Sequence, residues 1–248
     1  MKFRALLAPL ALALAVPALA QPGPMGGPPG GPGGGPPRRA YANPSAGIAA
    51  DLERARLTGE KKGRWHAMRQ TAAPDAVMFV PQMVLAQPWL KARNDLLPGY
   101  KLRPFSAWAS CDGSLIVTSG AWRDGTSDGW YTTVWQRQEK GEYKWVFDHG
   151  GPADKPLAEP EMLEARVAEC PATRSKRPPP APEQAKRGKA KPQPIVFDPT
   201  SRQGRSNDGS LIWQVTAGPD GSHRFIAGML VNGQMEPFRD EKVKLGGS

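Results

Sequence analysis

Four strand-like runs follow one another between residues 100 and 150: YKLRPFSAWASC (100–111), GSLIVTSGAW (113–122), GWYTTVWQRQ (129–138) and EYKWVFDHG (142–150). They are rich in aromatic and β-branched side chains, which is typical of strands. The short segments CDG, RDGTSD and EKGE separate them and have the composition of hairpin turns. These residues predict a four-strand antiparallel meander.

Helical patterns precede the meander. Asn43-Pro44-Ser45 has the composition of an N-cap followed by proline at the first helical position. Apolar residues then recur at near-helical spacing to about Lys62, and Gly63 is expected to end this helix; they are Ile48, Leu52, Ala55 and Leu57. Further along, the patterns predict a helix at RWHAMRQTA (64–72), a buried strand at DAVMFV (75–80) and short helices at AQPWLKAR (86–93) and MLEARVAEC (162–170). Residues 42–170 are therefore expected to form one α+β domain, with a curved antiparallel sheet packed against helices on one face.

A second group of strands lies near the C-terminus. GSLIWQVTAG (209–218), SHRFIAGML (222–230) and QMEPF (234–238) are joined by PDG and by Asn232-Gly233, a strong hairpin signal. They predict a small three-stranded meander within a C-terminal region of residues 195–248. CDGSL (111–115) continues as IVTSGAW and NDGSL (207–211) as IWQVTAG, so we interpret them as one turn used twice and not as a duplicated site.

The remaining segments concern export and attachment. Lys2 and Arg4 precede an apolar run that ends near Ala20-Gln21, which predicts a signal peptide at residues 1–20 and a periplasmic or secreted protein. Residues 21–41 form a Gly/Pro-rich arm, and residues 171–194 a Pro-rich linker with seven basic and one acidic residue in 171–192. The net charge of +10 lies mostly in these segments, so no nucleic-acid partner is expected. The linker at 174–191 is either a plain spacer or a weak attachment to an anionic surface.

The chain has two cysteines, Cys111 and Cys170. Export to an oxidising compartment favours a disulfide between them, with two buried free thiols as the alternative. Neither a CxxC nor an HxxxH pattern is present, and the three histidines are far apart in sequence, so no metal site is expected.

The order of elements resembles the NTF2-like superfamily, and within it the SnoaL-like and DUF4440-type proteins. The resemblance covers about residues 44–152 and rests on AADLERARLTGEKKGRWHAMRQTAAPDAVMFVP (49–81), SCDGSLIVTSGAW (110–122) and YTTVWQRQEKGEYKWVFDHG (131–150). It implies a cone with a pocket between the concave sheet face and the helices, and a homodimer through the sheet. Enzymes of the family use an Asp or His in that pocket as a general base, with a donor for the developing oxyanion.

Candidate bases in this chain are His149, Asp148 and His66, with Asp75 at the start of the first strand. Strand alternation predicts Tyr143, Trp145, Phe147 and His149 on one face of the last meander strand, and Lys144, Val146 and Asp148 on the other. The candidate pocket lining is aromatic and comprises Trp65, Trp108, Trp122, Tyr131 and Trp145. Each candidate has a structural alternative, because aromatic side chains fill small cores and charged residues pair at surfaces.

These residues support two hypotheses for function. The first is an exported, non-catalytic module that binds a small apolar or aromatic ligand or mediates assembly. The second is an isomerase, dehydratase or cyclase with His149, Asp148 or His66 as general base in an aromatic pocket. No nucleotide-binding glycine loop or catalytic triad order is present, so neither hypothesis invokes a cofactor.

Overall fold

The computed structural model describes residues 42–60, 63–93, 100–125, 127–171 and 197–244. All of the described residues belong to one compact unit. The predicted signal peptide, the Gly/Pro arm and nearly all of the linker lie outside the described residues. No helix in the described part of the chain is long and apolar enough to cross a membrane.

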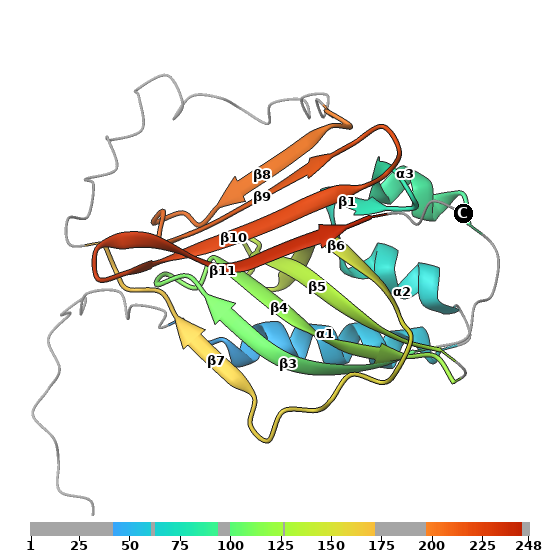
Figure 1. Ribbon diagram of the computed structural model, residues 1–248, viewed down its shortest axis with the longest axis horizontal. Coiled ribbons are helices and arrows are strands. Elements are labelled where there is room, and N and C mark those ends of the chain that lie inside the picture. The colour runs from blue at the N-terminus through green and yellow to red at the C-terminus, as the bar shows by residue number, and fades with distance from the viewer. Residues whose placement is uncertain (1–41, 61–62, 94–99, 126, 172–196, 245–248) are drawn as a thin grey trace, which may run out of the picture. The chain divides into compact units, whose positions relative to one another are not determined.

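Three helices cover one face of the larger sheet (Figure 1). They are α1 (Ser45–Thr58), α2 (Gly63–Thr71) and α3 (Ala86–Lys91). The side chain of Asn43 accepts a hydrogen bond from the Ser45 amide at 3.1 Å, as the predicted cap would. Gly63 has a φ of 74° and begins α2, whereas α1 ends at Thr58. The predicted order of helices before the meander is confirmed.

The larger sheet has seven strands in the order β2-β1-β6-β5-β4-β3-β7. Their bounds are β1 Ala72–Phe79, β2 Met83–Leu85, β3 Lys101–Ala109, β4 Leu115–Arg123, β5 Asp128–Arg137, β6 Tyr143–Ala153 and β7 Glu164–Val167. The predicted meander forms β3 to β6, but the sheet is mixed, because β1 pairs in parallel with β6 and β7 pairs in parallel with β3. The predicted helix at 162–170 is wrong. Residues 164–167 instead use their backbone groups to pair with the open edge of β3, while their side chains stay exposed.

The C-terminal region forms a separate four-stranded antiparallel sheet in the order β11-β10-β9-β8. Its strands are β8 Ser201–Arg205, β9 Leu211–Ala217, β10 His223–Val231 and β11 Gln234–Val243. The predicted three-strand meander is confirmed in outline, with β8 as an additional strand. The Asn232-Gly233 turn has the positive φ values, 50° and 74°, that its sequence predicted.

The second sheet packs on the face of the larger sheet that the helices leave open. Along β5, Tyr131 bonds to Asp51 of α1, whereas the next residue, Thr132, bonds to Glu241 of β11. Phe147 of β6 stacks on Phe225 of β10 with ring centroids 5.0 Å apart. One hydrophobic core therefore runs through both sheets.

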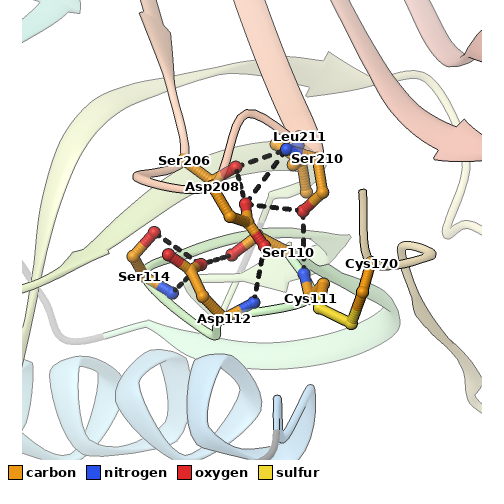
Figure 2. The surroundings of a disulfide bond; sticks show 9 residues. All are labelled: Ser110, Cys111, Asp112, Ser114, Cys170, Ser206, Asp208, Ser210 and Leu211. Carbon is orange, nitrogen blue, oxygen red and sulfur yellow. Dashed lines mark hydrogen bonds between the residues drawn. A yellow bond between two sulfur atoms is a disulfide. The ribbon is translucent and has the colours of Figure 1, made fainter. Parts of the chain in front are cut away.

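The two DGSL turns face each other where the sheets meet (Figure 2). In each turn the aspartate, Asp112 or Asp208, accepts hydrogen bonds from the serines on either side of it. Cys111 N donates to Ser210 Oγ at 2.8 Å, and its counterpart Asn207 N donates to Ser114 Oγ at 2.9 Å. The repeat is thus one turn used twice, and the two copies are also hydrogen-bond partners. The sequence had not predicted this pairing.

The disulfide predicted between Cys111 and Cys170 is present beside these turns, with Cα atoms 5.1 Å apart (Figure 2). The segment before Cys170 touches both sheets, since Ala168 N donates to Ala109 O and Glu169 N to Leu230 O. The disulfide therefore anchors residues 168–170, which hydrogen-bond to both sheets, at the junction between the sheets.

A β-bulge overturns the predicted faces of β6. Val134 is paired with Phe147, but the next residue, Trp135, is paired with Trp145, so Val146 is the extra residue. Trp145 consequently points to the helices, where its indole donates to Met68 O at 3.0 Å, while Phe147 and His149 point to the second sheet. The predicted strict alternation of side chains between the two sheet faces through residues 142–149 is wrong. The extra residue, Val146, reverses the face that each side chain takes on one side of the bulge.

Candidate functional site

Arg54 of α1 is the centre of a buried polar cluster between α1 and the larger sheet. Its side chain is 2 % exposed. Nη1 donates to Asp148 Oδ2 at 2.6 Å, Nη2 donates to Thr133 Oγ1 at 2.9 Å, and Nη2 lies 3.4 Å from Asp51 Oδ1. The guanidinium also lies 5.2 Å from the ring centroid of Trp135. Burial lowers the pKa of Arg54, but the charge and hydrogen bond of Asp148, together with Tyr100 and Asp51, raise the pKa overall.

Asp51 is the other carboxylate of this cluster and is fully buried. It accepts hydrogen bonds from the Tyr131 hydroxyl at 3.0 Å and the Trp135 indole at 3.2 Å. Burial raises the pKa of Asp51 to about 6, although Arg54 and the hydrogen-bond donors oppose the rise. Burial also raises the pKa of Tyr131, with the neighbouring Asp51 adding to the effect.

The buried face of α1 is therefore polar. Its buried positions include Gly47, Asp51, Arg54 and Thr58, which lie on one side of the helix. An added Cβ at Gly47 would lie 2.6 Å from Ile116 Cγ2, so the missing side chain lets α1 approach β4 closely. The cluster lies between α1 and the sheet, where the resemblance implied a pocket. Within it, the side chain of Asp148 is 16 % exposed to solvent.

His149 lies on the opposite face of the sheet and is 3 % exposed. Its Nε2 is 2.8 Å from Glu241 Oε2, and its Nδ1 is 3.0 Å from His223 Nε2. His223 Nδ1 is in turn 3.0 Å from the carbonyl oxygen of Gly221, so this nitrogen is the donor. His223 Nε2 then accepts from His149 Nδ1, and His149 Nε2 donates to the Glu241 carboxylate. The hydrogen bonds thus place His149 between two acceptors, the Glu241 carboxylate and His223 Nε2.

The pKa shifts of the two partners agree with this assignment. Burial lowers the pKa of His223 to about 4, so it stays neutral near pH 7 and can accept the proton of His149. Burial also opposes ionisation of Glu241, but the hydrogen bond and charge of His149, helped by Arg239, lower its pKa overall. Arg239 further donates to Ser119 of β4, which adds another contact between the sheets.

The predicted pocket residues do not gather around one cavity. Trp108 stacks on Phe238 of the second sheet at 4.8 Å, and Trp65 contacts Trp89 edge to face at 5.2 Å. The other three lie in or near the helix-facing layer: Tyr131 bonds to Asp51, Trp145 bonds to Met68 O, and the Trp122 indole donates to Trp130 O.

The candidate bases are equally dispersed. Asp148 faces α1, His149 faces the second sheet, and His66 lines a surface hollow with residues of α3. Asp75 forms an ion pair with Arg202 of β8. The sequence missed Asp51, Arg54, His223 and Glu241, although the spacing of Asp51, Arg54 and Thr58 at i, i+3 and i+7 could have indicated one polar helix face. In the described part of the chain, no cluster of three or more His, Cys, Asp or Glu residues is suited to a metal ion. The expectation that no cofactor is needed stays a prediction.

A shallow hollow of about 560 Å³ lies on the second sheet. Apolar side chains in it include Ile212, Ile226, Met235 and Pro237, and Gly228 contributes no side chain. Ile212 and Met235 are 39 % and 38 % exposed, which is high for such large apolar residues on a strand.

Comparisons with known proteins found matches among solved structures. No protein-family model matches the sequence, and no curated protein matches it. Among solved structures, a "putative ketosteroid isomerase" from Parabacteroides distasonis ATCC 8503 is 12 % identical, with 47 % of this chain and 98 % of that chain covered and a TM-score of 0.37. A second protein with that description, from Shewanella frigidimarina NCIMB 400, is 18 % identical over 43 % of this chain and 94 % of its own, with a TM-score of 0.32.

A third structure is an NTF-2 like protein of unknown function from Pseudomonas aeruginosa, 18 % identical over 44 % of this chain and 93 % of that chain, with a TM-score of 0.29. The order of helices and strands from α1 to β6 is the order that the resemblance implied. In fold, the chain resembles the NTF2-like superfamily, while the narrower likeness to SnoaL-like and DUF4440-type proteins stays a prediction.

Proposed function

We propose that this protein is an exported, non-catalytic module with an NTF2-like fold that binds a small apolar or aromatic ligand. The observation that carries the proposal is that both strand-borne candidate bases are already engaged within the chain. Each ring nitrogen of His149 has a partner, and Asp148 accepts from both Arg54 and Thr133. A general base needs a free acceptor beside its substrate, so these contacts favour a structural role for both residues.

The hollow on the second sheet supports ligand binding. Its volume of about 560 Å³ falls in the range of small-molecule sites, and the apolar side chains in its lining suit an apolar ligand, although Arg205 also lines it. Gln203 and Gln214 at its border offer amide groups that could orient a polar end of such a ligand. The hollow is shallow, so we expect modest affinity.

A fluorescent apolar probe tests the proposal. N-phenyl-1-naphthylamine, which is uncharged, is titrated into the full chain and into the variant Ile226→Glu, which places a charge inside the hollow. Thr216→Glu is the control, since Thr216 is exposed on β9 but does not line the hollow. We expect saturable binding that Ile226→Glu abolishes and Thr216→Glu leaves unchanged. Equal binding by all three proteins would refute the hollow as the site.

Assembly is the other form of this proposal, and sedimentation of the same variants distinguishes it from ligand binding. The homodimer through the larger sheet that the resemblance implies would need a surface other than the one facing the second sheet, because that face is covered within the chain. Loss of self-association in Ile226→Glu, without any probe binding by the wild type, would assign the hollow to assembly.

Attachment to an anionic surface through residues 174–191 stays a prediction, because this segment lies outside the described residues.

The enzyme alternative has a distinct signature. An isomerase, dehydratase or cyclase would lose turnover in Asp148→Asn or His149→Gln while keeping substrate affinity. Any turnover with that response would overturn the non-catalytic proposal.

A further inference from the structure

A second hollow, of about 620 Å³, lies between α2 and α3. Its lining comes from His66, Arg69 and Gln70 of α2 and from Gln87, Pro88 and Lys91 of α3. Three of these six side chains are basic, and none of the described lining residues is acidic. The hollow therefore carries the charges of Arg69 and Lys91 with no carboxylate in its described lining.

Arg69 is the central observation. Three other half-buried arginines in the described chain form ion pairs with carboxylates: Arg64 with Asp124, Arg202 with Asp75, and Arg239 with Glu241. A fourth, Arg137, donates to the backbone carbonyl of Asp112 at 3.0 Å. The guanidinium of Arg69 has no carboxylate partner among the described residues, and its polar contact is His66 Nδ1 at 3.5 Å. An arginine that is half-buried without a counter-ion leaves donors available to a ligand.

The basic side chains are not needed to complete the end of helix α2. The last carbonyl groups of a helix require donors, and other residues supply them here. Gln87 Nε2 donates to Arg69 O at 3.1 Å and to Ala72 O at 3.2 Å, and Lys144 Nζ donates to Gln70 O at 2.6 Å. These bonds offset the negative end of the helix dipole, which otherwise disfavours an anion. They leave Arg69, Lys91 and His66 free to face the hollow.

We infer that this hollow binds an oxyanion, the phosphate or carboxylate group of a small molecule or lipid headgroup. The fork of Arg69 suits two oxygens of such a group, and Lys91 adds a mobile second charge. This inference is independent of the proposed function, because the apolar hollow lies on the second sheet.

Calorimetric titration of the full chain with inorganic phosphate and with acetate, at low salt, is the direct test. We expect binding that Arg69→Gln weakens about tenfold, the loss of one charge-assisted contact. Arg56→Gln is the control with the same charge change, since Arg56 is exposed on α1 and pairs with Glu53 and Glu60. No binding of either anion, or an equal loss in both variants, would overturn the site.

The source of the anion is then resolved with vesicles. Phosphatidylglycerol vesicles, with phosphatidylcholine vesicles as the neutral reference, are mixed with wild type and Arg69→Gln. Binding that depends on Arg69 and on the anionic lipid assigns the hollow to a headgroup, whereas phosphate binding without this dependence assigns it to a soluble ligand. Circular dichroism checks that Arg69→Gln folds, and Lys91→Gln, at an exposed position, serves as the second variant.

Discussion

Acid should weaken the junction between the two sheets through His223, and the size of the effect depends on its environment. Burial lowers the pKa of His223 from 6.5 to about 4. Between these values the unfolded chain binds a proton that the folded chain does not, so stability falls as the pH falls. Lowering the pH from 7 to 5 should therefore remove about 2 kcal/mol of unfolding free energy through this residue.

Protonation of Asp51 changes the free energy of unfolding in the opposite direction as the pH falls. Its pKa is raised from 3.8 to about 6, so below pH 6 the folded chain binds a proton that the unfolded chain does not, and stability rises. Over the same interval this adds about 1 kcal/mol. The wild type should thus lose only about 1 kcal/mol between pH 7 and pH 5, the difference of the two effects.

The assay is urea unfolding monitored by tryptophan fluorescence at both pH values, with the disulfide intact. In His223→Gln an amide keeps a donor and an acceptor near Gly221 and His149 but does not titrate. This variant should gain about 1 kcal/mol between pH 7 and pH 5, and Asp51→Asn should lose the full 2 kcal/mol or so. A wild-type pH response retained in His223→Gln would refute the assignment of a neutral, proton-accepting His223.

Three further predictions concern stability, each measured by urea unfolding at pH 7. Arg54→Met should cost about 3 to 5 kcal/mol, because it leaves the carboxylates of Asp51 and Asp148 without their cation, and a loss below 1 kcal/mol would contradict the buried network. Replacing both Cys111 and Cys170 by serine should cost up to about 4 kcal/mol, because the disulfide closes a loop with a sequence separation of 59, and an unchanged midpoint would contradict this. Ser210→Ala should cost about 1 to 2 kcal/mol by leaving the Cys111 amide without its acceptor, whereas exposed Thr216→Ala should be nearly neutral.

Local sequence signals predicted the elements well where neighbours in the chain determine the structure. The meander, the Asn43 cap and the Asn232-Gly233 turn all depend on a few adjacent residues, and all are present. Residues 164–167 had helical composition but formed a strand, because the free edge of β3 offers hydrogen bonds that an isolated short helix cannot match.

The candidate site was harder to predict because its residues lie far apart in the sequence. Arg54 and Asp148 are 94 positions apart, and His149 and His223 are 74 positions apart. The bulge at Val146 also decides which face each side chain takes, and a bulge leaves little trace in a single sequence. Predicting Trp145 and Phe147 on one face was therefore reasonable from the residues and wrong in the fold.

The second sheet explains why so many aromatic residues became core and did not line a pocket. Leu211, Trp213 and Val215 alternate with exposed residues along β9, so this strand has one apolar face that must be covered. A sheet of four strands gains its stability by packing that face, and the larger sheet presents Phe147 and Trp108 to it. Aromatic side chains of both sheets thus pack in one shared core. Because α1 meanwhile buries a charged arginine on the other face, both faces of the larger sheet are packed against other described elements of the chain.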